Sequence, residues 1–114
     1  MDIKYIGKLL IASLFILAGL YSLINGFDDY TNAIASKGIP LAIFIAFGVL
    51  LFKIIAGLVI LFSQNEQYTK LAVIGLIIFT VLVTILYHNP FQDKSQINNM
   101  LKNIAVIGGL LLLY

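Results

Sequence analysis

The chain has 114 residues, of which 61% are hydrophobic and only 11% are charged, with a formal net charge of +2. This composition excludes a disordered or fibrous chain and argues against an ordinary soluble domain. The absence of cysteine excludes disulfides and thiolate chemistry, and the small charge without any arginine argues against a nucleic-acid partner. One membrane helix needs about 20 apolar residues, so four spans with short connections fit the length.

The first predicted span covers about residues 6–24 and follows a short tail that carries two lysines. We expect it to remain uncleaved, because no small-x-small site ends it and further apolar segments follow. Turn residues at 25–29 end this helix, and a partly polar stretch continues to Gly38. The second span covers about residues 39–63, where Pro40 suits a first helical turn because that position needs no backbone N–H.

The third predicted span covers about residues 70–87 and ends before an Asn-Pro pair, because proline disfavours a helical residue ahead of it. The fourth span, about residues 96–114, is less apparent because its unbroken apolar run begins only at Ile104. Apolar residues at helical spacing precede that run, and Ser95 is a suitable N-cap. The predicted fold is an all-α, integral membrane four-helix bundle that forms a single domain over residues 1–114.

An even number of spans places both ends of the chain on the same side of the membrane. The lysines are nearly balanced between the two sides, so the positive-inside rule gives only a weak preference. Lys4 and Lys8, however, lead into the first helix, which usually dominates orientation. We therefore expect both termini to face the cytoplasm.

Polar side chains at helical spacing within the spans are expected to turn away from lipid and toward the bundle interior. The predicted topology places them in the half of the membrane opposite the termini, as a polar pocket for the head of an amphiphile such as a quinone. The candidate ligand-binding residues are Tyr21, Ser22, Asn25, Thr84, Tyr87, His88, Asn99 and Lys102. A structural role also fits, because such hydroxyls often bond their own backbone and such amides often cap helices or face water.

His88 is the only histidine in the chain, and its imidazole suits proton transfer or a hydrogen bond to a quinone carbonyl. A histidine at this position also suits a simple helix boundary. No second histidine or nearby carboxylate pair completes a metal site, so no bound metal is expected. The sequence contains no phosphate loop, dinucleotide fingerprint or nucleophile elbow, and it therefore assigns no catalytic residue.

Lys53 is the most unusual residue, because it lies well inside the second span. An ammonium at mid-membrane costs roughly 2.5–3.5 kcal/mol on insertion scales, and no acidic residue lies in a predicted span to pair with it. Two interpretations remain open. Lys53 either extends toward the Ser63 end of its helix, or faces the bundle and binds a carbonyl, a water molecule or an anionic group.

Several segments together resemble the DoxX family of small bacterial membrane proteins. They are Gly19, Gly38-Ile39-Pro40, Ala56-Gly57-Leu58, Tyr87-His88-Asn89-Pro90 and Leu101-Lys102-Asn103-Ile104-Ala105-Val106-Ile107-Gly108-Gly109-Leu110-Leu111. The resemblance covers nearly the whole chain and implies a four-helix protein of a bacterial inner membrane. The chain departs from the family at Lys53, where members commonly carry a glutamate, and this puts in doubt any role that needs a protonatable carboxylate there.

The resemblance also implies a link to membrane redox chemistry, because the family is related to the small subunit of a thiosulfate:quinone oxidoreductase. The favoured interpretation is a subunit or accessory protein of a quinone-linked membrane oxidoreductase system, with quinone as the candidate ligand and no covalently bound cofactor. The alternatives are a non-enzymatic binding or transport module for a small lipophilic molecule, and a structural membrane scaffold. The expected partners are the lipid bilayer, an oxidoreductase subunit and further copies of the chain.

Overall fold

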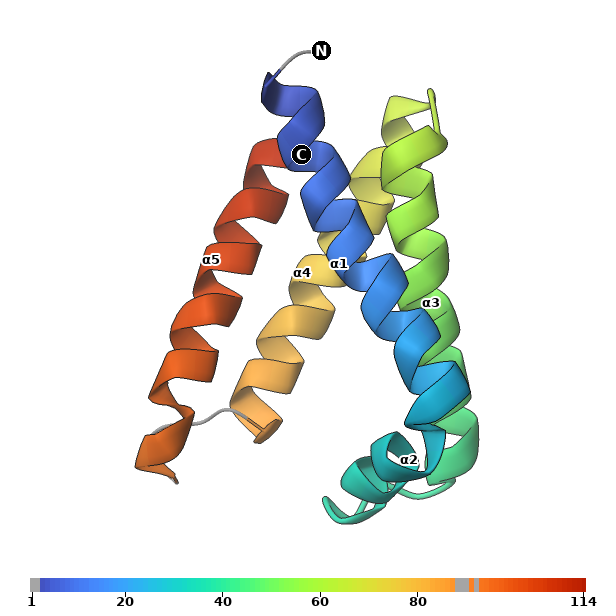
Figure 1. The fold of residues 1–114 in the computed structure, drawn as a ribbon, viewed down its shortest axis with the longest axis vertical. Helices are drawn as coiled ribbons and strands as arrows, with labels where there is room; N and C mark the ends of the chain where they lie inside the picture. Colours follow the sequence, from blue (N-terminus) through green and yellow to red (C-terminus); the bar gives the residue numbers. More distant parts are fainter. Residues whose placement is uncertain (1–2, 88–90, 92) are drawn as a thin grey trace.

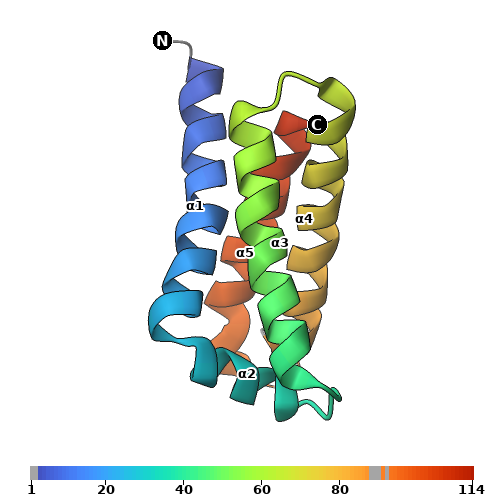
Figure 2. The same cartoon turned by 90° about the vertical axis from the view of Figure 1, so that its right-hand side faces the viewer.

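The computed structural model describes residues 3–87, 91 and 93–114. The elements are α1 (Ile3–Asn25), α2 (Phe27–Ala35), α3 (Ala42–Phe62), α4 (Glu66–Tyr87), the 3-10 turn η1 (Lys94–Gln96) and α5 (Ile97–Leu113). Four segments, namely α1, α3, α4 and Lys94–Leu113, are long and apolar enough to cross a membrane. They run lengthwise beside one another, while α2 lies at the end of the bundle opposite both termini (Figures 1 and 2). The predicted all-α membrane bundle is confirmed.

Helix α2 begins at Phe27, so the prediction of a turn over residues 25–29 is wrong for 27–29, which are helical, and the rest of α2 occupies the partly polar stretch. Asp28 and Asp29 lie in its first turn, where a negative charge interacts favourably with the helix dipole. Ile34 is buried on its other side, and α2 packs against α3. A helix of only nine residues is not stable alone in water, so its formation depends on this tertiary packing.

The connection from α2 to α3 places Pro40 outside the helix rather than in its first turn. Gly38 and Leu41 both have left-handed backbone angles, with φ of 77° and 55°. A left-handed residue cannot continue a right-handed helix, so α3 begins only at Ala42. The predicted position of Pro40 in the first turn of the second span is therefore wrong.

The start of the fourth span is capped by Asp93 and not by Ser95. One Asp93 carboxylate oxygen accepts hydrogen bonds from the backbone nitrogen of Ser95 at 3.0 Å and from its hydroxyl at 2.7 Å. These bonds hold the pKa of the exposed Asp93 carboxyl below its usual value. Ser95 thus acts as a donor to the cap, because the carboxylate two residues earlier is the stronger acceptor.

The most extensive packing between spans in the described residues is that of α1 and α3, where each helix presents a glycine to the other. A Cβ added at Gly19 would lie 2.7 Å from Cγ1 of Ile54, and one at Gly57 would lie 2.6 Å from Cγ1 of Ile16. Gly57 also faces the Ala12 carbonyl oxygen, which would be 3.0 Å from such a Cβ. Small residues at these points allow the two backbones to pack closely, which is a major source of helix association in lipid.

The main apolar core lies in the half of the bundle nearer the termini. Its buried residues come from all four spans, and they are Ala12, Phe15, Ala56, Ile60, Ala72, Val73, Leu76 and Leu110. Toward the α2 end, α4 and α5 diverge from α1 and α2 (Figure 1). The bundle is therefore well packed at one end and more open at the other.

We predict that Gly57→Val lowers the free energy of unfolding by about 1–3 kcal/mol, because the added methyl groups force α1 away from α3. Gly48→Val is the matched control on the same helix, since a Cβ there meets nothing within 4 Å. Thermal unfolding in a non-ionic detergent measures both. Equal stability of the two variants would contradict the proposed close packing.

Candidate functional site

A cavity of about 400 Å³ lies between the helices in the more open half of the bundle. Its lining residues come from all five helices, and they are Leu14, Phe15, Ala18, Tyr30, Ala33, Ile34, Lys53, Phe79, Thr80, Val83, Tyr87, Asn103 and Val106. The volume falls in the range of about 300–1,000 Å³ that is usual for small-molecule sites. Most of the lining is apolar, with a few polar groups from separate helices.

The spans form two pairs, α1 with α3 and α4 with α5, and the pairs are joined where α3 packs against α4. The contact between α1 and α5 is much smaller. Near the termini α1 and α5 are in contact, with Ile11 lying against Gly109. At the other end α2 lies across part of the space between the pairs (Figures 1 and 2). Helix α2 therefore forms one wall of the cavity and contributes Tyr30, Ala33 and Ile34 to it.

Lys53 is the one charged residue among the described residues that line the cavity. Its Nζ atom lies 5.4 Å from the centre of the Phe79 ring and 6.0 Å from the centre of the Tyr30 ring, within the range of cation–π contacts. No aspartate or glutamate lines the cavity in the part of the chain that the structure describes. The ammonium is therefore held by aromatic faces without a carboxylate partner among the described residues.

The direction of the Lys53 side chain distinguishes between the two interpretations of its role. It faces the bundle and extends toward Tyr30 on α2, away from the Ser63 end of α3. The physical reason is that side chains on an α-helix tilt toward the N-terminus of the helix, and Ser63 follows the C-terminus of α3. Extension toward Ser63 would run against this tilt.

Most polar groups around the cavity already donate hydrogen bonds within the protein. Thr80 Oγ1 donates to the Leu76 carbonyl oxygen at 2.8 Å, and Thr84 Oγ1 donates to that of Thr80 at 2.7 Å. Asn103 Nδ2 donates to Thr84 Oγ1 at 3.0 Å, which joins α5 to α4. These contacts explain how the polar residues are accommodated in an apolar bundle.

Two donors in the cavity lining remain available for a ligand. Among the described residues, neither the Lys53 ammonium nor the Tyr30 hydroxyl donates a hydrogen bond. Burial, together with the neighbouring Tyr87, raises the pKa of Tyr30 to about 12. The Tyr30 hydroxyl therefore keeps its proton at neutral pH and remains a donor.

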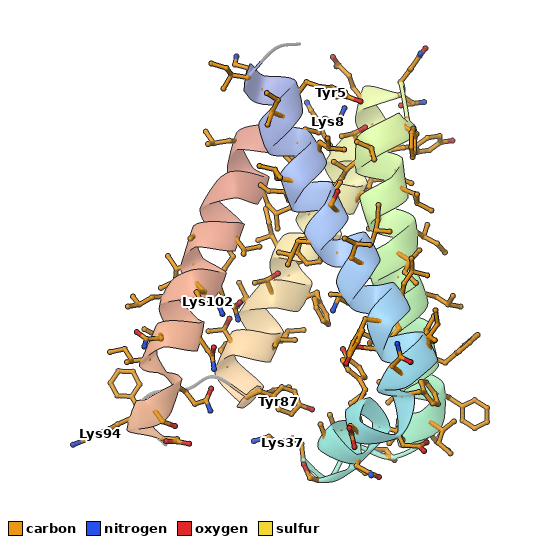
Figure 3. All side chains as sticks on the ribbon, in the orientation of Figure 1. Tyr5, Lys8, Lys37, Tyr87, Lys94 and Lys102 are labelled. Atoms are coloured by element: carbon orange, nitrogen blue, oxygen red, sulfur yellow. The ribbon has the colours of Figure 1, made fainter. Side chains whose placement is uncertain are left out.

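Tyr87 connects the end of α4 to α2. Its hydroxyl donates to the Ala33 carbonyl oxygen at 3.2 Å, and the Lys37 Nζ lies 5.2 Å from the centre of its ring. Figure 3 shows Lys37 and Tyr87 beside each other at the α2 end, while Tyr5 and Lys8 lie at the opposite end. These contacts hold α2 in place as a wall of the cavity.

The eight candidate ligand-binding residues have different environments in the structure. Tyr87 lines the cavity. Thr84 does not line it, but its hydroxyl accepts a hydrogen bond from Asn103, which does. Asn99 Nδ2 donates to Gln96 Oε1 one turn earlier. The candidates that do not line the cavity include Tyr21, which is 67% exposed, the exposed Asn25 and Lys102, and the half-buried Ser22. His88 lies outside the described residues.

Tyr30 and Phe79 were not selected from the sequence, although their rings face Lys53. Tyr30 was missed because α2 was not predicted as a helix. The signal that could have found it was the spacing of Tyr30, Ala33 and Ile34, which lie three and four residues apart and share a helical face. Phe79 has no distinguishing signal, since phenylalanine is ordinary in a membrane span.

The comparisons with known proteins agree with this architecture. The sequence profile of the DoxX family matches residues 3–89. The chain belongs to the DoxX family. It is 33% identical over 113 residues to inner membrane protein YqjF of Escherichia coli (strain K12). The aligned region covers 95% of this chain and 78% of that relative. No solved structure matches the chain.

The family, the relative and the four apolar helices identify a small multi-pass protein of a bacterial inner membrane. The DoxX match extends from the start of α1 to just beyond α4 and so includes Lys53, Tyr30 and Phe79. The cavity of this DoxX protein thus lies largely within the matched segment, with α5 completing it.

We predict that Lys53→Leu raises the free energy of unfolding by about 1–3 kcal/mol, because it removes a charge that lacks a carboxylate partner in the described cavity. Lys70→Leu is the matched control. The Lys70 Nζ also lies over an aromatic ring, 5.2 Å from the centre of Tyr114, but Lys70 is exposed. Its replacement should change stability by less than about 0.5 kcal/mol. A less stable Lys53→Leu variant would show that the ammonium is well paired in the native protein.

Proposed function

We propose that this DoxX protein binds a membrane quinone in the cavity and acts as a subunit or accessory protein of a quinone-linked oxidoreductase system. The observation that carries the proposal is the combination of an apolar cavity with two available donors, Lys53 and Tyr30. A quinone ring is flat and apolar, and its carbonyl oxygens accept hydrogen bonds. It therefore matches both the apolar walls and the donors.

The position of the cavity supports a ligand that arrives from the bilayer. The cavity is partly open rather than enclosed, and Leu14 on its lining is 48% exposed. A lipophilic tail can then remain in the membrane while the head enters the bundle. In this role the chain holds and orients the quinone, and a partner oxidoreductase supplies or accepts the electrons.

The proposed orientation has both termini in the cytoplasm, which places the cavity in the outer half of the membrane. The lysines that lead into α1 support this orientation through the positive-inside rule. A partner that exchanges electrons with a quinone in this cavity would then contact the α2 end of the bundle.

The alternative function is a non-enzymatic binding or transport module for a different lipophilic molecule. The observation that favours it is the charge of Lys53, because a neutral quinone accepts a hydrogen bond from the ammonium but does not neutralise it. Both functions use the same cavity and differ in whether electrons are transferred.

The binding test uses the purified protein in phosphatidylcholine nanodiscs and a short-chain ubiquinone analogue, with calorimetry as the readout. We expect Lys53→Met to weaken binding by about tenfold, because it removes a charged donor and keeps a side chain of similar length. Lys94→Met is the control, since Lys94 is exposed and does not line the cavity. No binding, or equal binding by the two variants, would contradict the quinone site.

A second measurement separates the two functions. Deletion of the protein should lower quinone reduction in native membranes, and gentle solubilisation should recover an oxidoreductase with it. If the analogue binds but quinone reduction is unchanged, the protein is a binding module without a redox role.

A further inference from the structure

We infer that the cavity prefers an amphiphile whose head carries a carboxylate over one of the same shape with a neutral head. This inference rests on one part of the proposed function, namely that the cavity binds an amphiphile, and it does not depend on a redox role. It names the chemical class of ligand that the described side chains stabilise best, and it makes Lys53 the residue that determines this preference.

The charge balance of the cavity is the first argument. The Lys53 ammonium lies near two aromatic rings in a mostly apolar cavity, and no described residue in the lining carries a negative charge. The acidic pair of α2, Asp28 and Asp29, is exposed in the first turn, and it lies on a separate depression near Ile24. Because an ion in apolar surroundings needs a counter-charge or hydrogen bonds, a bound anion relieves a cost that a neutral ligand leaves in place.

The positions of the donors are the second argument. A carboxylate has two oxygens that both accept hydrogen bonds. The cavity offers two donors that are not already engaged with described residues, the ammonium of Lys53 and the hydroxyl of Tyr30, and the ammonium lies 6.0 Å from the centre of the Tyr30 ring. Both side chains approach the same space from different helices, α3 and α2. A carboxylate that binds in this space accepts from the Lys53 ammonium, and Tyr30 lines the same space.

The remainder of the site suits the tail of such a ligand. Leu14, Val83 and Val106 form apolar walls on three different spans. The cavity is partly open, so an alkyl or aromatic tail can extend out of it while the head stays inside. The aromatic faces of Tyr30 and Phe79 complete the surroundings of the head. A lipophilic carboxylate thus matches the cavity in charge, hydrogen bonding and shape.

The test compares dodecanoate with methyl dodecanoate, which has nearly the same shape and no charge. Binding to the full chain in nanodiscs of zwitterionic phosphatidylcholine is measured by calorimetry at neutral pH. We expect the carboxylate to bind at least about tenfold more tightly than the ester, because charge-assisted hydrogen bonds are the stronger ones. Lys53→Met should remove this preference while it retains binding of the ester.

The controls assign the preference to one residue. Lys94→Met, at an exposed position outside the cavity, should keep the full preference for the carboxylate. Lys53→Arg keeps the positive charge and should retain most of the preference, which separates charge from loss of folding. If the preference persists in a folded Lys53→Met protein, another cation is responsible and the inference is overturned.

Two further outcomes distinguish this inference from the proposed function. Equal binding of carboxylate and ester to the native protein would mean that water solvates the ammonium, and it would overturn the inference while the quinone site survives. Failure of the carboxylate, the ester and the quinone analogue to bind would overturn both.

Discussion

The solvation of a single ammonium inside an apolar bundle is the constraint on which the interpretation of this protein depends. Lys53 lies in the middle of a membrane span, and its side chain faces the interior of the bundle. Two aromatic rings lie near it, and they compensate the charge only in part. The space around the ammonium is a cavity of about 400 Å³ rather than a region filled by core side chains.

The uneven packing of the bundle explains where this space occurs. Near the termini, residues from all four spans form a continuous core. The close contact of α1 with α3 through Gly19 and Gly57 holds one pair of spans together, and α4 with α5 forms the other. Helix α2 lies at the opposite end, packs against α3 and lines the cavity there. The packed core and the cavity therefore lie largely in different halves of one small domain.

The sequence predicted the spans and the anomaly at Lys53 because both depend on local hydropathy. An apolar run in lipid must form a helix to satisfy its backbone, so the spans follow from composition alone. Helix α2 was missed because its stability depends on the burial of Ile34 next to α3, which is a tertiary contact. The placement of Pro40 was wrong because the left-handed backbone at Leu41 delays the start of α3.

The candidate site was harder to predict for a related reason. Helical periodicity shows which residues share a face, but it does not show toward which neighbour that face turns. Tyr21 and Tyr87 both lie in polar rows near the ends of their helices, yet Tyr21 is exposed whereas Tyr87 bonds to α2. Tyr30 on α2 lies next to Lys53 on α3. The sequence did not predict this contact, because it did not predict the course of the chain between the first and second spans.

The most direct test of the central claim is to observe the Lys53 ammonium itself by nitrogen-15 NMR of lysine-labelled protein in nanodiscs. We predict that adding a saturating amphiphile that binds in the cavity shifts the Lys53 resonance, while that of Lys70 at the other end of the bundle stays unchanged. If the Lys53 resonance does not move although the amphiphile is bound, the ligand does not contact the ammonium and the assignment of the cavity as the binding site is wrong.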